Sequence, residues 1–310
     1  MDFNFDNNIK IFAEASPSVF GAELLSIELK ARNIENIKTD NQAEADISFI
    51  VDESIDRDSY KIKINNSAIY FYASGKRGFI YAYGHMLRKM TKADNGFCLP
   101  DISGDYSPDK AIRGHQIGYR TTPNTYDAWS YENYRKYSLE MMYFGTNTVE
   151  HIPYQTGVSK RNRLMKYDEE EFLVEASKMA DEYDLNVSLW HPNYDNETHE
   201  SAAKRRGELY AKLKRLDYVF IPGGDPGELP ADVFIDRCIE VSKALKRVHP
   251  EAQMWPSAQM PHDFPNWAET FISKLSAEPD EIDGIIYGPN HAMPIDELYD
   301  KLPKKYPLRF

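Results

Sequence analysis

Short apolar runs alternate with amphipathic stretches through the second two thirds of the chain. The runs have the length of buried parallel strands, and the stretches between them have helical spacing. The predicted strands are 112–119, 146–152, 186–190, 218–221, 253–255, 282–287 and the start of another at 306–310. The predicted helices are 130–144, 169–183, 200–216, 231–248, 267–275 and 295–302. Six or seven such units of one polarity favour an α/β fold of the (β/α)₈ TIM-barrel type over a doubly wound sheet.

The number of units is smaller than a complete barrel requires. Eight units at this spacing need about 40 to 60 further residues, yet the chain ends at Phe310, inside the seventh predicted strand. We therefore expect a barrel truncated within strand 7, and a fragment rather than an open barrel, because an unpaired strand edge invites aggregation. No glycine-rich phosphate motif follows the first strand, which argues against a nucleotide-binding fold.

Residues 1–108 have a different pattern. Apolar alternation predicts a strand at 45–51 and a hairpin over 60–72, and helical spacing predicts helices over 18–31 and 75–89. These elements predict a small α+β domain that precedes an incomplete barrel domain over 109–310. The stretch from Thr91 to Pro108, which contains Asp-Asn-Gly and two prolines, is interpreted as a linker.

The composition narrows the class of protein. The 310 residues carry a net charge of −12 with no basic block, so we expect no nucleic-acid partner. The N-terminus lacks the pattern of a signal peptide and no run has transmembrane length, so a cytoplasmic protein without a membrane partner is predicted. Cys98 and Cys238 are isolated and indicate neither a disulfide framework nor a metal cluster.

Polar and aromatic residues stand at the ends of the predicted barrel strands. A barrel brings the carboxyl ends of its strands to one mouth, so we expect these side chains to converge there. Aromatic faces stack on sugar rings, and His, Arg, Asn and Gln bind hydroxyl or carboxylate groups, so the set suits a carbohydrate substrate. The predicted substrate-binding residues are His115, Tyr119, Arg120, His151, Trp190, His191, Trp255, Gln259 and Tyr287.

A glycine pair and two carboxylates follow the fourth barrel strand. Tyr218 to Ile221 runs into Gly223-Gly224, and Asp225 and Glu228 come next. A pair of acids at a strand end suits general acid–base catalysis, so Asp225 and Glu228 are the predicted catalytic residues. The alternative is an ordinary turn in which Asp225 caps the following helix.

Several of these stretches resemble a known group of enzymes. The hairpin and helix over 60–87, the Ile112-Arg113-Gly114 that opens the barrel and the segment 221–225 resemble β-hexosaminidases and α-glucuronidases. The stretches 113–120, 126–129 and 223–227 look like bacterial α-glucuronidase-type glycosyl hydrolases.

The resemblance implies a glycoside hydrolase that acts on a uronic acid or an amino sugar. It implies that Asp225 is a catalytic-site carboxylate, that Glu228 donates a proton and that Arg120 binds a uronate carboxylate. Hexosaminidases place a Glu directly after the Asp, whereas Pro226 follows here.

Two other functions stay open. The first is a metal-dependent barrel hydrolase or isomerase, in which ligands would come from His115, His151, His191, Asp225, His262 and His291. No His-x-His or Glu-x-x-His pair supplies two ligands from one element, so no metal or other cofactor is predicted. The second is a non-catalytic carbohydrate-binding barrel. The sequence leaves the oligomeric state open.

Overall fold

The chain forms two compact units in the computed structural model. The structure describes residues 2–65, 68–118, 128–152, 163–193, 196–224, 227–262, 264–288 and 291–309. The first unit comprises residues 1–114, 135–147 and 183–185, and the second comprises 115–134, 148–182 and 186–310. Two short segments from beyond residue 109 therefore cluster with the N-terminal part of the chain.

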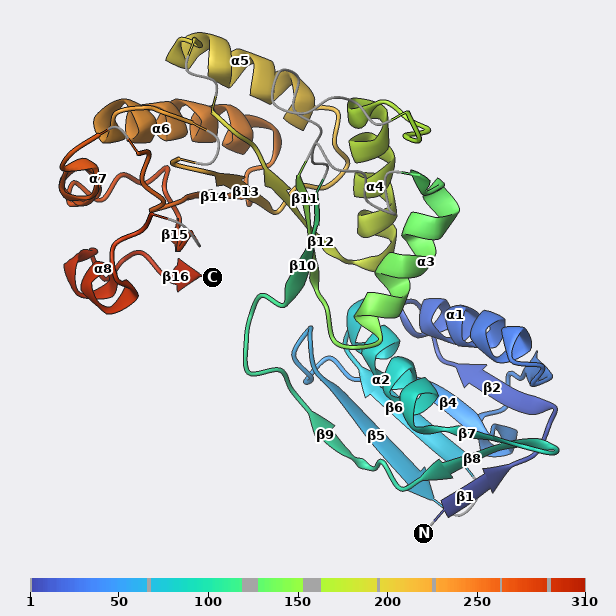
Figure 1. The fold of residues 1–310 in the computed structure, drawn as a ribbon. Helices are drawn as coiled ribbons and strands as arrows, with labels where there is room; N and C mark the ends of the chain where they lie inside the picture. Colours follow the sequence, from blue (N-terminus) through green and yellow to red (C-terminus); the bar gives the residue numbers. More distant parts are fainter. Residues whose placement is uncertain are drawn as a thin grey trace. The chain divides into compact units, whose positions relative to one another are not determined.

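A six-stranded mixed sheet is the centre of the first unit (Figure 1). The strand order is β3 (Asn36–Lys38), β2 (Ile9–Ala13), β4 (Ile47–Val51), β6 (Ala68–Ala73), β5 (Tyr60–Asn65) and β9 (Gly104–Tyr106). The first four strands in this order are parallel, and β5 runs antiparallel to both of its neighbours. The β5–β6 pair is the predicted hairpin. A short 3-10 helix, η1 (Gln42–Glu44), precedes β4.

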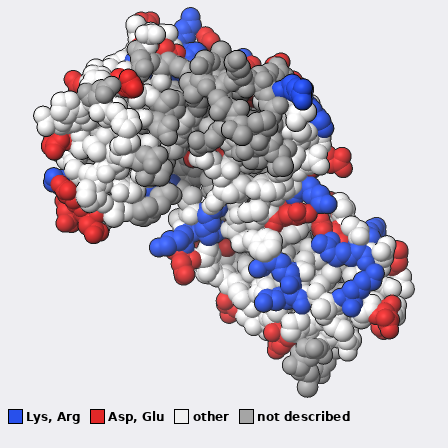
Figure 2. Space-filling view, in the orientation of Figure 1, with Lys and Arg blue, Asp and Glu red and all other residues white. Residues whose placement is uncertain are grey.

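Helices α1 (Ser18–Ala31) and α2 (Lys76–Lys89) pack on one face of this sheet (Figure 1). The Phe49 ring lies 5.1 Å from the Phe71 ring and 5.6 Å from the Phe79 ring, and all three are fully buried. Burial of each such side chain contributes about 1.5–3 kcal/mol. On the face shown in Figure 2, basic and acidic side chains are interspersed over this unit.

Residues 91–108 do not form a linker, and that interpretation is wrong. They contain β7 (Thr91–Ala93), β8 (Gly96–Pro100) and β9, and β8 pairs with both β7 and β1 (Asp2–Phe5). The Asp-Asn-Gly sequence is the turn of the β7–β8 hairpin, with Gly96 at φ +108°. Phe97 and Leu99 alternate along β8 and are fully buried, and the Phe97 ring stacks on Phe5 at 4.9 Å. Apolar alternation therefore outweighs the turn residues here.

The second unit contains the predicted repeat of strands and helices. Its sheet has the order β10 (Gly114–Gly118), β11 (Thr148–Ile152), β12 (Asn186–Trp190), β13 (Tyr218–Ile221) and β14 (Gln253–Pro256). The strands from β11 to β14 are parallel, as are β15 (Ile285–Ile286) and β16 (Leu308–Arg309). A parallel bridge between Ser257 and Ile286 joins the two groups. The described strands therefore follow one another in chain order, which confirms the predicted parallel arrangement.

A helix follows each of the strands from β10 to β15. The helices are α3 (Tyr131–Met142), α4 (Glu169–Tyr183), α5 (His199–Tyr210), α6 (Ala231–Val248), α7 (Trp267–Leu275) and α8 (Ile295–Lys301). Helix α6 buries Phe234, Cys238 and Val241, which share one face at helical spacing. The side chain of Thr198 caps α5 by accepting a hydrogen bond from the Ser201 amide. No helix within the described ranges combines the length and the apolar character needed to span a membrane.

Candidate active site

The sheet formed by the parallel strands has two faces. We call the face that carries Glu150 the carboxylate face and the face that carries His151 the helix face. These neighbours on β11 point to opposite sides, as alternate residues of a strand do. Glu150 is in register with Ser188 on β12, which is in register with Tyr218 on β13, so these three residues lie on the carboxylate face. His151 contacts Tyr134 of α3 and Phe172 of α4, so it lies on the helix face.

Glu150 is the central polar group of the carboxylate face. Its Oε1 accepts a hydrogen bond from Gln116 Nε2 at 2.6 Å, and its Oε2 accepts one from Ser188 Oγ at 3.0 Å. Burial raises the pKa of Glu150, and these two hydrogen bonds oppose the rise. A carboxyl group in such surroundings can hold or accept a proton nearer to neutral pH than an exposed glutamate can.

Aromatic rings occupy the next layer of the same face, toward the carboxyl ends of the strands. Trp190, Phe220 and Trp255 are in register, and the rings of Trp190 and Phe220 are 6.3 Å apart. The Arg309 guanidinium lies 3.6 Å from the Trp255 ring centroid and 5.2 Å from that of Tyr218. Trp255 is 2% exposed, so the ring predicted to stack on a sugar already stacks on a cation inside the protein.

Two of the predicted mouth histidines, His151 on β11 and His191 directly after β12, lie on the helix face instead. His151 Nε2 and Tyr134 Oη are 2.9 Å apart, and His191 Nδ1 and Tyr210 Oη of α5 are 3.3 Å apart. Burial lowers the pKa of His151 to about 3 and that of His191 well below its usual value. Both rings are therefore neutral core groups. His115 on β10 influences the pKa of His151, and burial lowers its own pKa to about 4.

The loops after β13 and β14 approach each other closely, and this explains the glycine pair. A Cβ on Gly223 would lie 2.2 Å from the Gln259 carbonyl oxygen, and one on Gly224 would lie 2.6 Å from the Met260 backbone. Neither residue has the positive φ that a left-handed turn requires, so the pair is needed for close contact. Gln259 itself is 4% exposed, and its amide donates to Ser257 Oγ at 3.1 Å.

The loop after β15 joins the same group. A Cβ on Gly288 would lie 2.7 Å from the Gln259 Cβ, and the Met260 amide donates to the His291 carbonyl oxygen at 2.8 Å. The rings of His262 and His291 are 3.8 Å apart. The loops that follow β13, β14 and β15 are therefore in contact with one another. Among the described residues, no group of three or more His, Cys, Asp or Glu side chains could hold a metal ion.

The predicted catalytic pair is described only in part. Asp225, like Tyr119 and Arg120, lies outside the described residues. Glu228 is exposed and follows Gly227, whose φ is +141°, in the segment between β13 and α6. The amide of Tyr287, directly after β15, donates to the Arg309 carbonyl oxygen at 2.7 Å.

Glu150 and Arg309 were not among the predicted site residues, although both lie on the carboxylate face or against it. The signal for Glu150 was present, because a carboxylate stood inside a predicted strand, between Val149 and His151. Arg309 gave no comparable signal, since it follows Leu308 at the end of the chain and its contact with Trp255 depends on the return of β16 beside β15.

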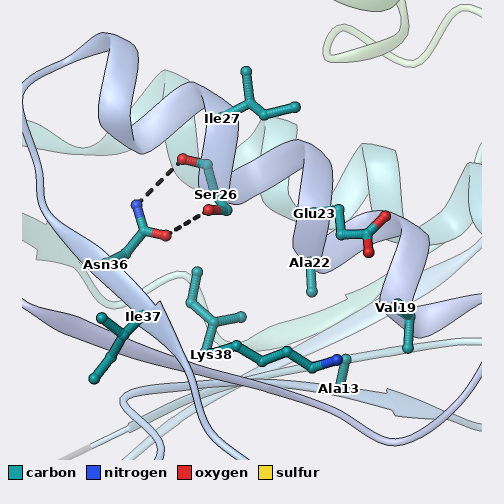
Figure 3. Close-up of a pocket in the computed structure, with 10 residues that line it drawn as sticks. Ala13, Val19, Ala22, Glu23, Ser26, Ile27, Asn36, Ile37 and Lys38 are labelled. Carbon is teal, nitrogen blue, oxygen red and sulfur yellow. Dashed lines mark hydrogen bonds between the residues drawn. The ribbon is translucent and has the colours of Figure 1, made fainter.

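A pocket in the first unit contains none of the predicted site residues. It has a volume of about 380 Å³ and lies between α1, β2 and β3 (Figure 3). Its walls are mostly apolar, including Ile27 and Ile37. Ser26 Oγ donates to Asn36 Oδ1 at 2.6 Å, so these two polar groups of the lining bind each other.

The fold is similar to those of solved hexosaminidases. No protein-family model matches the chain, and no curated protein matches its sequence. A β-N-acetylhexosaminidase from Streptomyces coelicolor A3(2) matches 97% of the chain with a TM-score of 0.70 and 11% identity. The chitobiase of Flavobacterium johnsoniae matches 99% with a TM-score of 0.68 and 14% identity. An exo-β-N-acetylglucosaminidase from Vibrio harveyi, in complex with N-acetylglucosamine, matches 100% with a TM-score of 0.64 and 12% identity.

The match covers only part of each of these proteins. The chain spans 69% of the Streptomyces coelicolor protein, 62% of the Vibrio harveyi protein and 56% of the Flavobacterium johnsoniae protein. At these identities the similarity is one of fold. Within this chain, the shared fold includes both the mixed sheet of the first unit and the βα repeat of the second.

Proposed function

We propose that this chain is a glycoside hydrolase, or the greater part of one, that acts on the glycosidic bond of an N-acetylated amino sugar. The observation that carries the proposal is the fold match, which extends over 97–100% of the chain to three β-N-acetylhexosaminidase-type enzymes. A fold hosts many activities, so the match alone supports the class of chemistry as an analogy. The carboxylate face, with its half-buried glutamate and its buried tryptophans, is compatible with that class.

The proposal includes a (β/α)₈ barrel. The strands from β10 to β16 follow one another in chain order, and helices alternate with them as in such barrels. In this arrangement the carboxylate face is the barrel interior, and the converging loops after β13, β14 and β15 form part of its mouth. The catalytic groups would then lie where Asp225 and Glu228 follow β13.

Asp225 and Glu228 have distinct roles in the proposed mechanism. Asp225 stabilises the charge that develops at the anomeric carbon, either directly or through the substrate's acetamido group, and Glu228 protonates the leaving oxygen. For this role the Glu228 side chain faces the substrate from the segment between β13 and α6. Because Pro226 separates the two acids in sequence, Glu150 is a second candidate for proton transfer, with the raised pKa that such a role needs.

The metal-dependent alternative has less support from the site. His151 and His191, two of its proposed ligands, are on the helix face and each binds a tyrosine hydroxyl.

A panel of aryl glycosides tests the proposal. The protein is assayed with 4-nitrophenyl N-acetyl-β-glucosaminide, N-acetyl-β-galactosaminide, β-glucoside and α-glucuronide, with and without EDTA. We expect turnover of an N-acetylhexosaminide that exceeds turnover of the β-glucoside and is unaffected by the chelator. Preferential turnover of the α-glucuronide would show that the substrate carries a uronic acid and not an amino sugar. Loss of activity in EDTA would favour the metal-dependent alternative, and binding without turnover would favour the non-catalytic one.

A further inference from the structure

A second pocket in the first unit combines aromatic walls with an arginine. Its volume is about 250 Å³, and its walls come from α2, β5, β9 and the turn 143–145 after α3. All of its lining residues belong to the first unit, so its geometry is independent of how the two units are arranged. No residue of the proposed active site contributes to it.

Flat aromatic surfaces line this pocket. The rings of Tyr60 and Tyr106 stack with centroids 4.9 Å apart and an interplanar angle of 18°. His85 contacts both rings of this stack, with its own ring 4.8 Å from that of Tyr106 and its Nδ1 3.1 Å from Tyr60 Oη. Phe144 is 70% exposed, which is unusual for so large an apolar side chain at a pocket. Such faces stack against the C–H groups of a sugar ring.

Two charged side chains of the pocket, Arg113 and Asp58, bind partners within the protein. Arg113 donates to Asp58 Oδ2 at 2.9 Å, to the Gly145 carbonyl oxygen at 2.8 Å and to the Lys110 carbonyl oxygen at 2.6 Å. Burial acts to raise the pKa of Asp58, but its bonds to Arg77, Arg113 and Asn147 hold the pKa below its usual value. Asp58 is therefore an internal counter-ion and does not repel an anionic ligand strongly.

Arg88 is the other cation of the pocket, and its neighbours differ from those of Arg113. Its guanidinium lies 5.2 Å from the Phe144 ring centroid, and its Nε donates to the Gly84 carbonyl oxygen of its own helix at 3.3 Å. Within the described part of the chain, no carboxylate forms an ion pair with Arg88. The planar edge of the guanidinium that carries the terminal nitrogens is therefore available to an external carboxylate, which it can bind in bidentate fashion.

We propose that this pocket is an accessory binding site for an acidic sugar, a single six-membered ring that carries a carboxylate. Arg88 binds the carboxylate, and the sugar ring lies against Phe144 and the edge of the Tyr106 stack. The volume is below the ~300–1,000 Å³ that is typical of sites for drug-sized ligands, which suits one ring. A neutral sugar would leave Arg88 without a counter-ion, so the site prefers the acid. This site is separate from the proposed catalytic one and holds whether or not the chain is a hydrolase.

Calorimetric titration tests this site with D-glucuronate, D-glucose and benzoate as probes. D-glucose has the same ring without the carboxylate, and benzoate has the carboxylate without the sugar ring. We expect D-glucuronate to bind in the millimolar range and each of the other two to bind at least about fivefold more weakly. Because the contact is an ion pair at a partly exposed site, added salt should weaken the binding of D-glucuronate.

Two neighbouring positions on α2 provide a matched pair of variants. Arg88 and Lys89 are both exposed in the last turn of the helix, and only Arg88 lines the pocket. Each substitution to glutamine removes one positive charge, but only Arg88 would contact the ligand. We therefore expect Arg88→Gln to weaken D-glucuronate binding about tenfold or more, and Lys89→Gln to change it less than twofold. Phe144→Ala should weaken it severalfold, and circular dichroism should show that all three variants are folded.

Three results would overturn the site. The first is absence of binding at tens of millimolar D-glucuronate. The second is binding that survives Arg88→Gln unchanged or falls equally in Lys89→Gln, which would place the ligand elsewhere or reduce the effect to general charge. The third is equal affinity for D-glucose or benzoate, which would remove the acidic sugar as the ligand class.

Discussion

The buried histidines of the second unit are structural residues held by tyrosine hydroxyl groups. His151 lies between β11 and the helices α3 and α4, where Tyr134 Oη is its hydrogen-bond partner. His191 has the same relation to Tyr210 of α5. A buried polar atom that loses its partner costs about 1–3 kcal/mol. These side chains therefore contribute to the stability of the protein and not to a substrate-binding mouth of a barrel.

Removal of the Tyr134 hydroxyl group should destabilise the protein. Tyr134→Phe keeps the ring and leaves His151 Nε2 without this partner, so we expect the free energy of unfolding to fall by about 1–3 kcal/mol in urea titrations. Tyr131→Phe on the same helix is the control, because its hydroxyl binds Glu171 at the surface, and it should change stability by less than about 0.5 kcal/mol. Equal effects of the two variants would contradict the structural role of His151.

The buried histidines also make stability depend on pH. In the unfolded chain a histidine takes up a proton near pH 6.5, whereas folded His151, with its pKa lowered to about 3, does so only in stronger acid. The contribution of His151 is thus complete above about pH 6.5 and is lost as the pH falls toward 3, by up to about 1.4 kcal/mol per pH unit.

A His151→Gln variant should flatten the pH dependence of unfolding in this window. The measurement is the free energy of unfolding from pH 7 to pH 4 in both proteins, and the difference in slope is the readout. Burial raises the pKa of Glu150, so Glu150 changes stability with pH in the opposite direction. Its contribution is present at low pH and is lost as the pH rises through its folded pKa. Parallel curves for the two proteins would show that His151 is not buried as a neutral group.

At the scale of helices and strands, sequence periodicity predicted the second unit closely. The bounds of β12, β13, α4, α6 and α7 agree with the prediction, because both strands are mostly apolar and the three helices have a clear amphipathic pattern. Residues 91–108 were misread because glycine and proline at hairpin turns resemble a linker when strands are only three to five residues long. The placement of His151 and His191 was missed because the position of a residue near a strand end does not decide its face.

The loops after β13 and β14 should not tolerate a side chain at Gly224. A methyl group there meets the backbone of Met260 and Pro261 at 2.6 Å, which flexible side chains cannot relieve. We expect Gly224→Ala to lower the free energy of unfolding by about 1–3 kcal/mol. Gly75→Ala, where a Cβ would meet nothing within 4 Å, is the matched control and should cost less than about 1 kcal/mol. A neutral Gly224→Ala would mean that the two loops do not touch.

At the level of the whole molecule, the chain has a mixed sheet covered by two helices and a longer βα repeat, and the fold similarity to solved hexosaminidases extends over 97–99% of it. The general class of the fold followed from the sequence pattern. The identity of the catalytic groups did not, because Asp225 was recognised from a short motif and its surroundings involve loops whose conformation periodicity does not determine.

One pair of variants decides whether Asp225 belongs to a glycosidase active site. Asp225→Asn and Asp232→Asn each remove one carboxylate, and Asp232 is an exposed residue in the first turn of α6. The measurement is kcat for the best aryl N-acetylhexosaminide of the panel, in variants whose folding is verified by circular dichroism. We predict that Asp225→Asn lowers kcat by about 10²-fold or more and that Asp232→Asn leaves it within twofold. Full activity in Asp225→Asn would exclude this carboxylate from catalysis and reduce the Gly-Gly-Asp segment to a turn that caps a helix.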